Sequence, residues 1–179
     1  MGKKPAMDTQ NAVVRAALAG AATGARSFTG LAVLALDTPG TATGQPDATL
    51  RHGWVQALMS AGAAGELVAD KLPQAPSRTA PPGLVSRLAA AAGVGFIVIR
   101  RSGPDRSAPG GVDASPSEAS GTQPGPAAAA VAAAVGAAVS TMWLGTRWRQ
   151  LAASWFGDDL PGAVLEDAWA LTLAWAAIR

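Results

Sequence analysis

The stretch GPAAAAVAAAVGAAVSTMWLGT, residues 125–146, decides the fold class of this chain. It holds 22 consecutive residues without a charged side chain, and most of them are alanine, valine or glycine. A helix needs about 20 mainly apolar residues to cross a bilayer core that is about 30 Å thick. The stretch therefore predicts a membrane-spanning helix. The basic and aromatic residues at 147–149 are typical of the membrane–water interface at which such a helix ends.

The composition of the whole chain agrees with a membrane setting. Of its 179 residues, 49% are hydrophobic and only 15% are charged, whereas soluble domains carry about 25% charged residues. We therefore expect one membrane domain, residues 1–179. We expect it to be a multi-pass protein of the cell membrane, with the lipid bilayer as its partner.

The same composition limits the chemistry. The chain has no cysteine and a single histidine, His52, which is a poor ligand set for zinc. The formal net charge is +2, and the basic residues are scattered without interleaved aromatics, so nucleic-acid binding is not expected. No glycine-rich phosphate loop and no serine triad spacing is present. We expect no metal, no cofactor and no enzymatic activity.

Outward from the opening stretch, further apolar segments predict an all-α integral membrane protein of about five spans, with about four to six as the range. A Gly-, Pro- and Ser-rich segment, residues 102–124, predicts a disordered linker. It separates a first half, 11–101, with three spans from a second half, 125–179, with two. Residues 37–51 predict an exposed loop, and residues 151–159 a short interfacial helix. The other predicted spans cover residues 11–36, 52–69, 80–99 and 160–178.

Small residues are expected to pack these spans together. Ala16, Gly20 and Gly24 lie four residues apart and so share one face of the first predicted span. This small-xxx-small spacing lets helices approach closely in lipid, and it also suits a homo-oligomer. We predict the same packing role for Gly62, Gly65 and Gly136.

Arg26 lies past the middle of the first predicted span, where an unpaired charge is costly. Two alternatives follow from its position. Either Arg26 faces a polar interior and a carboxylate, or the helix breaks between Gly24 and Gly30.

Four acidic residues are candidates for an ion or substrate pathway with Arg26 as their counter-charge. Glu66 and Asp70 are four residues apart on one helical face, just ahead of the prolines that end the second span. Glu166 and Asp167 lie about five residues, or about 8 Å, inside the last span. The structural alternative is that these acids form salt bridges with arginines and hold the spans together.

Two acidic segments also suggest an internal repeat. Residues 65–70 and 162–167 align without a gap, which places Asp70 opposite Asp167. One unpaired span separates the two copies, so the second copy would be upside down, as in the inverted repeats of many transporters. The match is short and lies in alanine-rich sequence, so chance similarity is an equal alternative.

Residues distributed along nearly the whole chain carry a family resemblance. They are Gly20 to Arg26, Leu31, Glu66, Asp70 to Pro73, Ser77, Arg78, Pro82, Pro161 and Leu165 to Asp167. Together they resemble the small bacterial multi-span membrane proteins catalogued as domain-of-unknown-function family 4126. The pattern departs from this family at 27–30, where Ser-Phe-Thr-Gly stands in place of an expected proline. The resemblance implies a membrane location and a helical fold, and no activity.

For function, we expect a small transporter or permeation protein that uses its intramembrane carboxylates. The alternative is a structural or oligomerising membrane scaffold in which the same acids form interhelical salt bridges. Acids that converge on a water-filled cavity would favour transport, whereas one-to-one pairs with arginine would favour the scaffold. The sequence does not identify a ligand.

Overall fold

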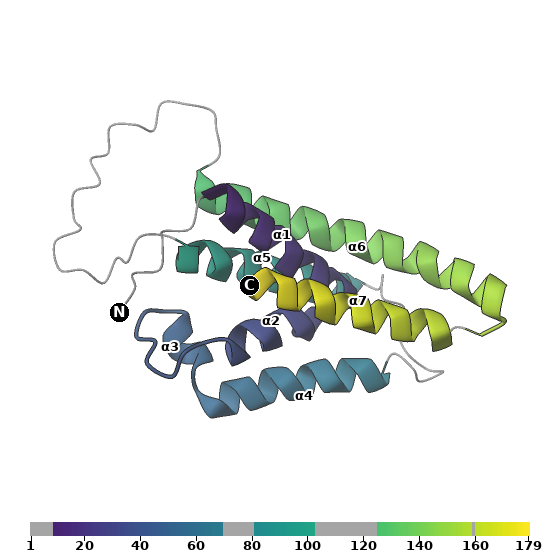
Figure 1. Ribbon diagram of the computed structural model, residues 1–179, viewed down its shortest axis with the longest axis horizontal. Coiled ribbons are helices and arrows are strands. Elements are labelled where there is room, and N and C mark those ends of the chain that lie inside the picture. The colour runs from purple at the N-terminus through teal and green to yellow at the C-terminus, as the bar shows by residue number, and fades with distance from the viewer. Residues whose placement is uncertain (1–8, 70–80, 103–124, 159) are drawn as a thin grey trace.

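The computed structural model describes residues 9–69, 81–102, 125–158 and 160–179 (Figure 1). This part of the chain contains helices and no strand, which confirms the all-α class for the described residues. Asp70, the prolines after it and the predicted linker lie outside these ranges, except for Ser102, which ends a helix. The helices in chain order are α1 (Thr9–Ala25), α2 (Ser27–Leu36), α3 (Asp47–Leu50), α4 (Gly53–Ala69), α5 (Pro81–Ser102), α6 (Pro126–Phe156) and α7 (Leu160–Ile178).

The first predicted span is a helical hairpin. Helix α1 ends before Arg26, whose φ of −144° and ψ of 114° are extended, and α2 begins at the next residue. A Cβ placed on Gly30 would lie 3.0 Å from the carbonyl oxygen of Ala19 and against the hydroxyl of Thr23. Residues before and after Arg26 are therefore neighbours, so α2 folds back along α1. The first predicted span, 11–36, is therefore interrupted within the region where the sequence allowed a break, and Arg26 forms the tip of the hairpin.

Helices α1 and α6 pack through small residues. A Cβ on Gly20 would lie 2.5 Å from the Cα of Ala134, and a Cβ on Gly24 would lie 2.6 Å from the Cα of Ala138. These distances are too short for any side chain, so both glycines are needed for the two backbones to approach. The residue numbers rise together along the two helices, so α1 and α6 run in the same direction.

Of the other predicted packing glycines, one lies at a contact and two do not. A Cβ on Gly62 would lie 2.7 Å from the ring of Phe28, so α4 approaches α2 at this point. Gly65 and Gly136 have open space where a Cβ would be. The packing prediction for these two is therefore wrong within a single chain. Gly95, which the sequence did not single out, packs α5 closely against α6, with a Cβ 2.8 Å from Ala134.

Helix α6 is longer than predicted. It continues without interruption through residues 147–149 to Phe156, so the span and the separate interfacial helix expected over 151–159 are one element. No glycine or proline lies between Thr146 and Phe156 to stop a helix. The stop comes at Gly157, whose φ of 70° is the left-handed conformation common at helix C-termini. Residues 37–51, predicted as a loop, also contain the short helix α3.

Small and charged residues fill the interior, and large apolar residues cover the outside. The buried apolar residues are mostly alanines, whereas Arg26, Arg87 and Glu166 are at least nine-tenths buried. Helix α7 shows the pattern in one element: its buried face is built from glycine, alanine and Glu166, while Trp169 and Trp175 are more than half exposed. Large apolar side chains that gather on the surface of a protein commonly mark a face that contacts lipid or another protein.

Two helices in the described part are long and apolar enough to cross a membrane. They are Gly83–Ser102 within α5 and Pro126–Phe156. Helix α2 is apolar but has only 10 residues, about 15 Å by helical rise. The two predicted halves do not show inverted topology, because inversion would require α1 and α6 to run in opposite directions.

Candidate functional site

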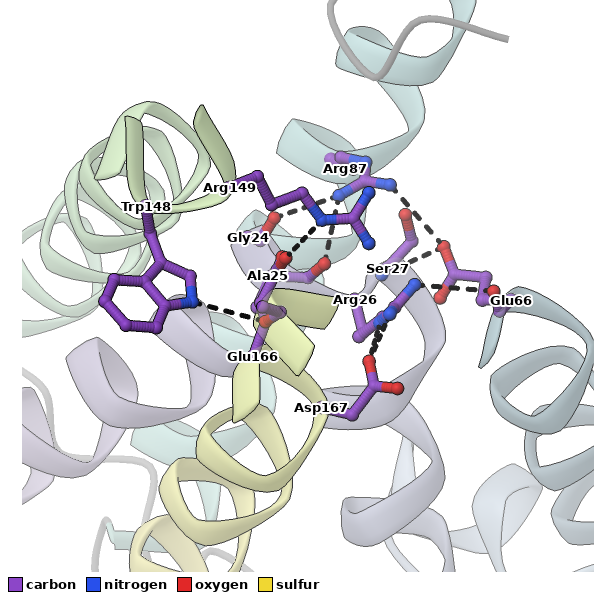
Figure 2. A network of polar contacts seen from close by, with 11 residues as sticks. Gly24, Ala25, Arg26, Ser27, Glu66, Arg87, Trp148, Arg149, Glu166 and Asp167 are labelled. Atoms are coloured by element: carbon purple, nitrogen blue, oxygen red, sulfur yellow. Dashed lines mark hydrogen bonds and ion pairs between the residues drawn. The ribbon is translucent and has the colours of Figure 1, made fainter. Parts of the chain in front are cut away.

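The site lies at the tip of the α1–α2 hairpin and is organised around Arg26 (Figure 2). The Arg26 side chain is 0% exposed. Its Nε donates to Oδ1 of Asp167 on α7 at 2.8 Å, and its Nη2 donates to the same oxygen. Its Nη1 donates to the main-chain oxygen of Glu66 on α4 at 3.4 Å. Both alternatives drawn from the sequence hold together: the helix breaks at Arg26, and Arg26 faces a carboxylate.

The carboxylate of Glu66 caps the start of α2. The backbone N–H of Ser27 donates to Glu66 Oε1 at 3.1 Å, and the N–H of Phe28 donates to Oε2 at 2.9 Å. The first N–H groups of a helix have no partner within the helix and carry its positive dipole end. A carboxylate from a neighbouring helix satisfies both the hydrogen bonds and the dipole.

Arg87 on α5 caps the C-terminal end of α1, where a positive charge is favourable. Its Nη1 donates to the carbonyl oxygens of Gly24 at 3.0 Å and Ala25 at 3.2 Å. Its Nη2 also lies 3.9 Å from Glu66 Oε1. The last carbonyls of a helix lack intrahelical partners and form its negative end, which a guanidinium stabilises. The hairpin tip is thus held by one acid and one base, each matched in sign to the helix end it contacts.

A second ion pair lies beside this tip, between α6 and α7. Arg149 Nε donates to Oε2 of Glu166 at 3.1 Å, and Glu166 is only 7% exposed. Gly145 lies one helical turn before Arg149, and a Cβ there would come within 3.3 Å of Glu166 Oε1. The indole N–H of Trp148 donates to the carbonyl of Gly162 at 3.2 Å. Residues 147–149 were expected at the membrane–water interface. Two of them, Trp148 and Arg149, instead bind α7.

The structure brings together four of the five residues predicted for the pathway. Arg26 contacts the carboxylate of Asp167 and the main-chain oxygen of Glu66, and Glu166 lies next to Asp167 in sequence but contacts Arg149. The fifth residue, Asp70, lies outside the described residues. Among the described side chains, no group of three or more His, Cys, Asp or Glu is arranged to hold a metal ion.

Arg87 and Arg149 are site residues that the predicted pathway did not include. Arg87 is the only charged residue between residues 81 and 99, so its isolation in an apolar helix was the available signal. Arg149 gave no such signal, because an arginine next to tryptophan at the end of an apolar stretch is typical of an interface.

The opposite end of α2 carries its own polar cluster. Arg101 on α5 donates to the carbonyl of Leu34 at 3.1 Å, to the hydroxyl of Thr38 at 2.6 Å and to Oδ1 of Asp47 at 2.7 Å. Gln56 on α4 donates to the carbonyl of Ala35 at 2.9 Å. A small cavity of about 40 Å³ lies beside this cluster, between α1, α2, α5 and α7. Side chains of α4 therefore satisfy α2 at both of its ends, and Arg101 of α5 joins them at the C-terminal end.

Comparisons of the chain with protein-family models, with curated proteins and with solved structures found no match. The resemblance to family 4126 stays a prediction. The candidate site therefore depends on the geometry of this chain alone.

Proposed function

We propose that this chain is a multi-pass protein of the cell membrane that lets an ion or a small charged solute permeate, with the hairpin tip as part of the pathway. The membrane part of the proposal is supported by the reversed distribution of side chains. Alanine and paired charges fill the interior, and tryptophan, leucine and phenylalanine face outward. In lipid, such an arrangement buries the polar groups and exposes the apolar ones.

The observation that carries the permeation part is the α1–α2 hairpin. Backbone that leaves the helical conformation at membrane depth is tolerated only where protein or a water-filled cavity surrounds it. Such interrupted helices form the binding sites of many transporters, because the helix ends present unpaired N–H and C=O groups. Here both helix ends meet at Arg26, and ionised side chains from α4, α5 and α7 converge on them.

The pairing of the acids with arginines is the arrangement expected of a scaffold, and it favours that alternative. Each described acid of the site has an arginine within 4.0 Å: Asp167 has Arg26, Glu66 has Arg87, and Glu166 has Arg149. Buried charges held in pairs lock helices together without any ligand. In this alternative the network stabilises the bundle and the protein moves nothing.

Flux through proteoliposomes distinguishes the two functions. We expect the parent protein to carry at least one species from a panel of small cations and anions. Asp167→Asn removes the ionised partner of Arg26, and we expect it to lower that flux about tenfold, a factor that corresponds to about 1.4 kcal/mol. Incorporation and helix content must match the parent, because an unpaired buried arginine also destabilises the fold.

The matched control is Asp158→Asn. Asp158 is exposed and accepts a hydrogen bond from the Leu160 N–H at 3.2 Å, a bond that an asparagine oxygen also accepts. Its flux should equal that of the parent. If the parent carries nothing across the whole panel while Asp167→Asn only lowers thermal stability, the scaffold is the correct function.

A further inference from the structure

Helix α4 is the least enclosed of the long helices. Val55 is its only buried residue in the described range, whereas α1, of equal length, buries eight. It packs mainly on α2 and on the short helix α3, and Figure 1 shows it at the edge of the bundle. Such an element separates from the bundle at a lower free-energy cost than a central helix, because little buried surface holds it.

Contacts of different kinds hold α4 to α2. Gln56 binds a carbonyl at the far end of α2, Gly62 receives the ring of Phe28, and Glu66 caps the near end. Of these three contacts, the one from Glu66 lies at the hairpin tip. If α4 moves away, the N–H groups of Ser27 and Phe28 lose their acceptors, and Arg26 and Arg87 each lose one contact with Glu66. Arg26 keeps Asp167, and Arg87 keeps the α1 carbonyls.

We propose that α4 is a movable latch and that Glu66 is its catch. When the Glu66 carboxylate leaves the N–H groups of Ser27 and Phe28, the start of α2 loses its cap and the hairpin tip opens. The Arg26–Asp167 pair and the bonds from Arg87 to α1 stay in place. This inference rests on the proposed function, because it names how the permeation site is regulated. Its physical basis is an asymmetry. The tip is bound from α5 and α7, which pack against α1 and α6, and from α4, which packs mainly on α2 and α3.

The absence of native cysteine allows the latch to be locked with a disulfide. A Cβ at Gly62 would lie 2.8 Å from Cγ of Phe28. In a disulfide, the Cβ of one cysteine lies about 3 Å from the sulfur of the other, and that sulfur takes approximately the place of Cγ. The double variant Phe28→Cys/Gly62→Cys therefore suits a disulfide that ties α4 to α2.

Hydrogen exchange at the amides of residues 27 and 28 reports the latch directly. In the full-length chain in lipid nanodiscs, we expect exchange to be about tenfold slower in the oxidised double variant than in the same protein after reduction. The two single-cysteine variants, treated with the same oxidant, should show no change. Equal exchange in the oxidised and reduced forms, with the disulfide verified by mass, would overturn the proposal.

A second variant tests the catch without any disulfide. Glu66→Gln removes the charge that caps α2, and we expect exchange at residues 27 and 28 to become about tenfold faster. Gly65→Ala is the control from the same helix, because a Cβ at Gly65 meets open space and the change should leave these two amides unchanged. If Glu66→Gln leaves their exchange unchanged, Glu66 is not the catch.

Flux separates this inference from the proposed function. If the parent transports, the oxidised lock should lower flux about tenfold and reduction should restore it. Flux that is insensitive to the lock, despite slowed exchange, would show that α4 does not regulate permeation. If the parent transports nothing but the exchange results hold, the proposed function fails and the latch stands as a motion of the scaffold.

Discussion

Gly20 and Gly24 are the positions at which α1 has no room for a side chain. The backbone of α6 occupies the place of their Cβ atoms, at 2.5 Å for the Cα of Ala134 and 2.6 Å for the Cα of Ala138. The spacing of small residues predicted this contact from sequence, because it depends only on periodicity within one helix. The spacing did not predict which helix would be the partner, since alanine-rich faces occur on several helices.

We expect Gly20→Ala to destabilise the protein by about 1–3 kcal/mol or more, because the added methyl group must push α1 away from α6. Thermal unfolding in detergent, followed by far-ultraviolet circular dichroism, measures the change. Gly136→Ala is the matched control: Gly136 is also in a helix interior, but a Cβ there meets open space. Its stability should rise by about 0.5–1 kcal/mol, because alanine has the higher helix propensity. Equal effects of the two variants would contradict the close packing of α1 on α6.

At the scale of the element, the sequence predicted the ends of most helices and missed the reversal of one. Proline or glycine punctuation placed α4, α5 and α7 within a few residues of their observed bounds. At Arg26, the flanking Gly24 and Gly30 allowed a break in the helix, but nothing in the apolar sequence around them indicated that the chain reverses there. The reversal depends on contacts from Glu66, Arg87 and Asp167, which lie 40 to 141 residues away in sequence. Local pattern contains no such information.

Helix α2 is held at its C-terminal end by Arg101, which yields a prediction independent of the latch. Arg101→Gln removes donors to the Leu34 carbonyl and to Asp47, and hydrogen bonds of charged groups contribute about 1.5–3 kcal/mol. We expect faster hydrogen exchange at the amides of Asp37 and Thr38, which bond to the last turn of α2. Exchange at residues 27 and 28 should not change.

The control for this prediction is the adjacent residue. Arg100 is exposed and lies over the ring of Phe96, with 5.6 Å from its guanidinium carbon to the ring centroid. Arg100→Gln changes the charge equally but removes no contact with α2. Faster exchange at Asp37 in both variants would show that net charge, rather than the cap, stabilises this end.

In the whole molecule, most large apolar side chains lie on the outside, and small or ion-paired side chains fill the interior. Low charge content predicted a membrane protein, but it did not predict how the charges are distributed. The structure places three arginines and three acids of the site inside an alanine framework, where each ion has a partner of opposite sign. A framework of small side chains brings helix backbones close together, so long arginine side chains reach across from one helix to the next. The Ala/Gly composition and the buried ion pairs are therefore two parts of one arrangement.

The tryptophans provide a test of the membrane setting for the whole chain. Five of the six are more than half exposed: Trp54, Trp143, Trp155, Trp169 and Trp175. In a bilayer these indoles contact lipid, whereas in water they would contact solvent. We expect blue-shifted emission in liposomes and strong quenching by lipids brominated on their acyl chains, with little quenching by iodide in the aqueous phase. The mutation Trp169→Phe should lower the lipid-quenched signal, because Trp169 lies on the outer face of α7, away from the helix ends. Emission that is quenched by aqueous iodide and unaffected by brominated lipid would mean that these faces meet water, and the chain would then have to hide its apolar surface by self-association.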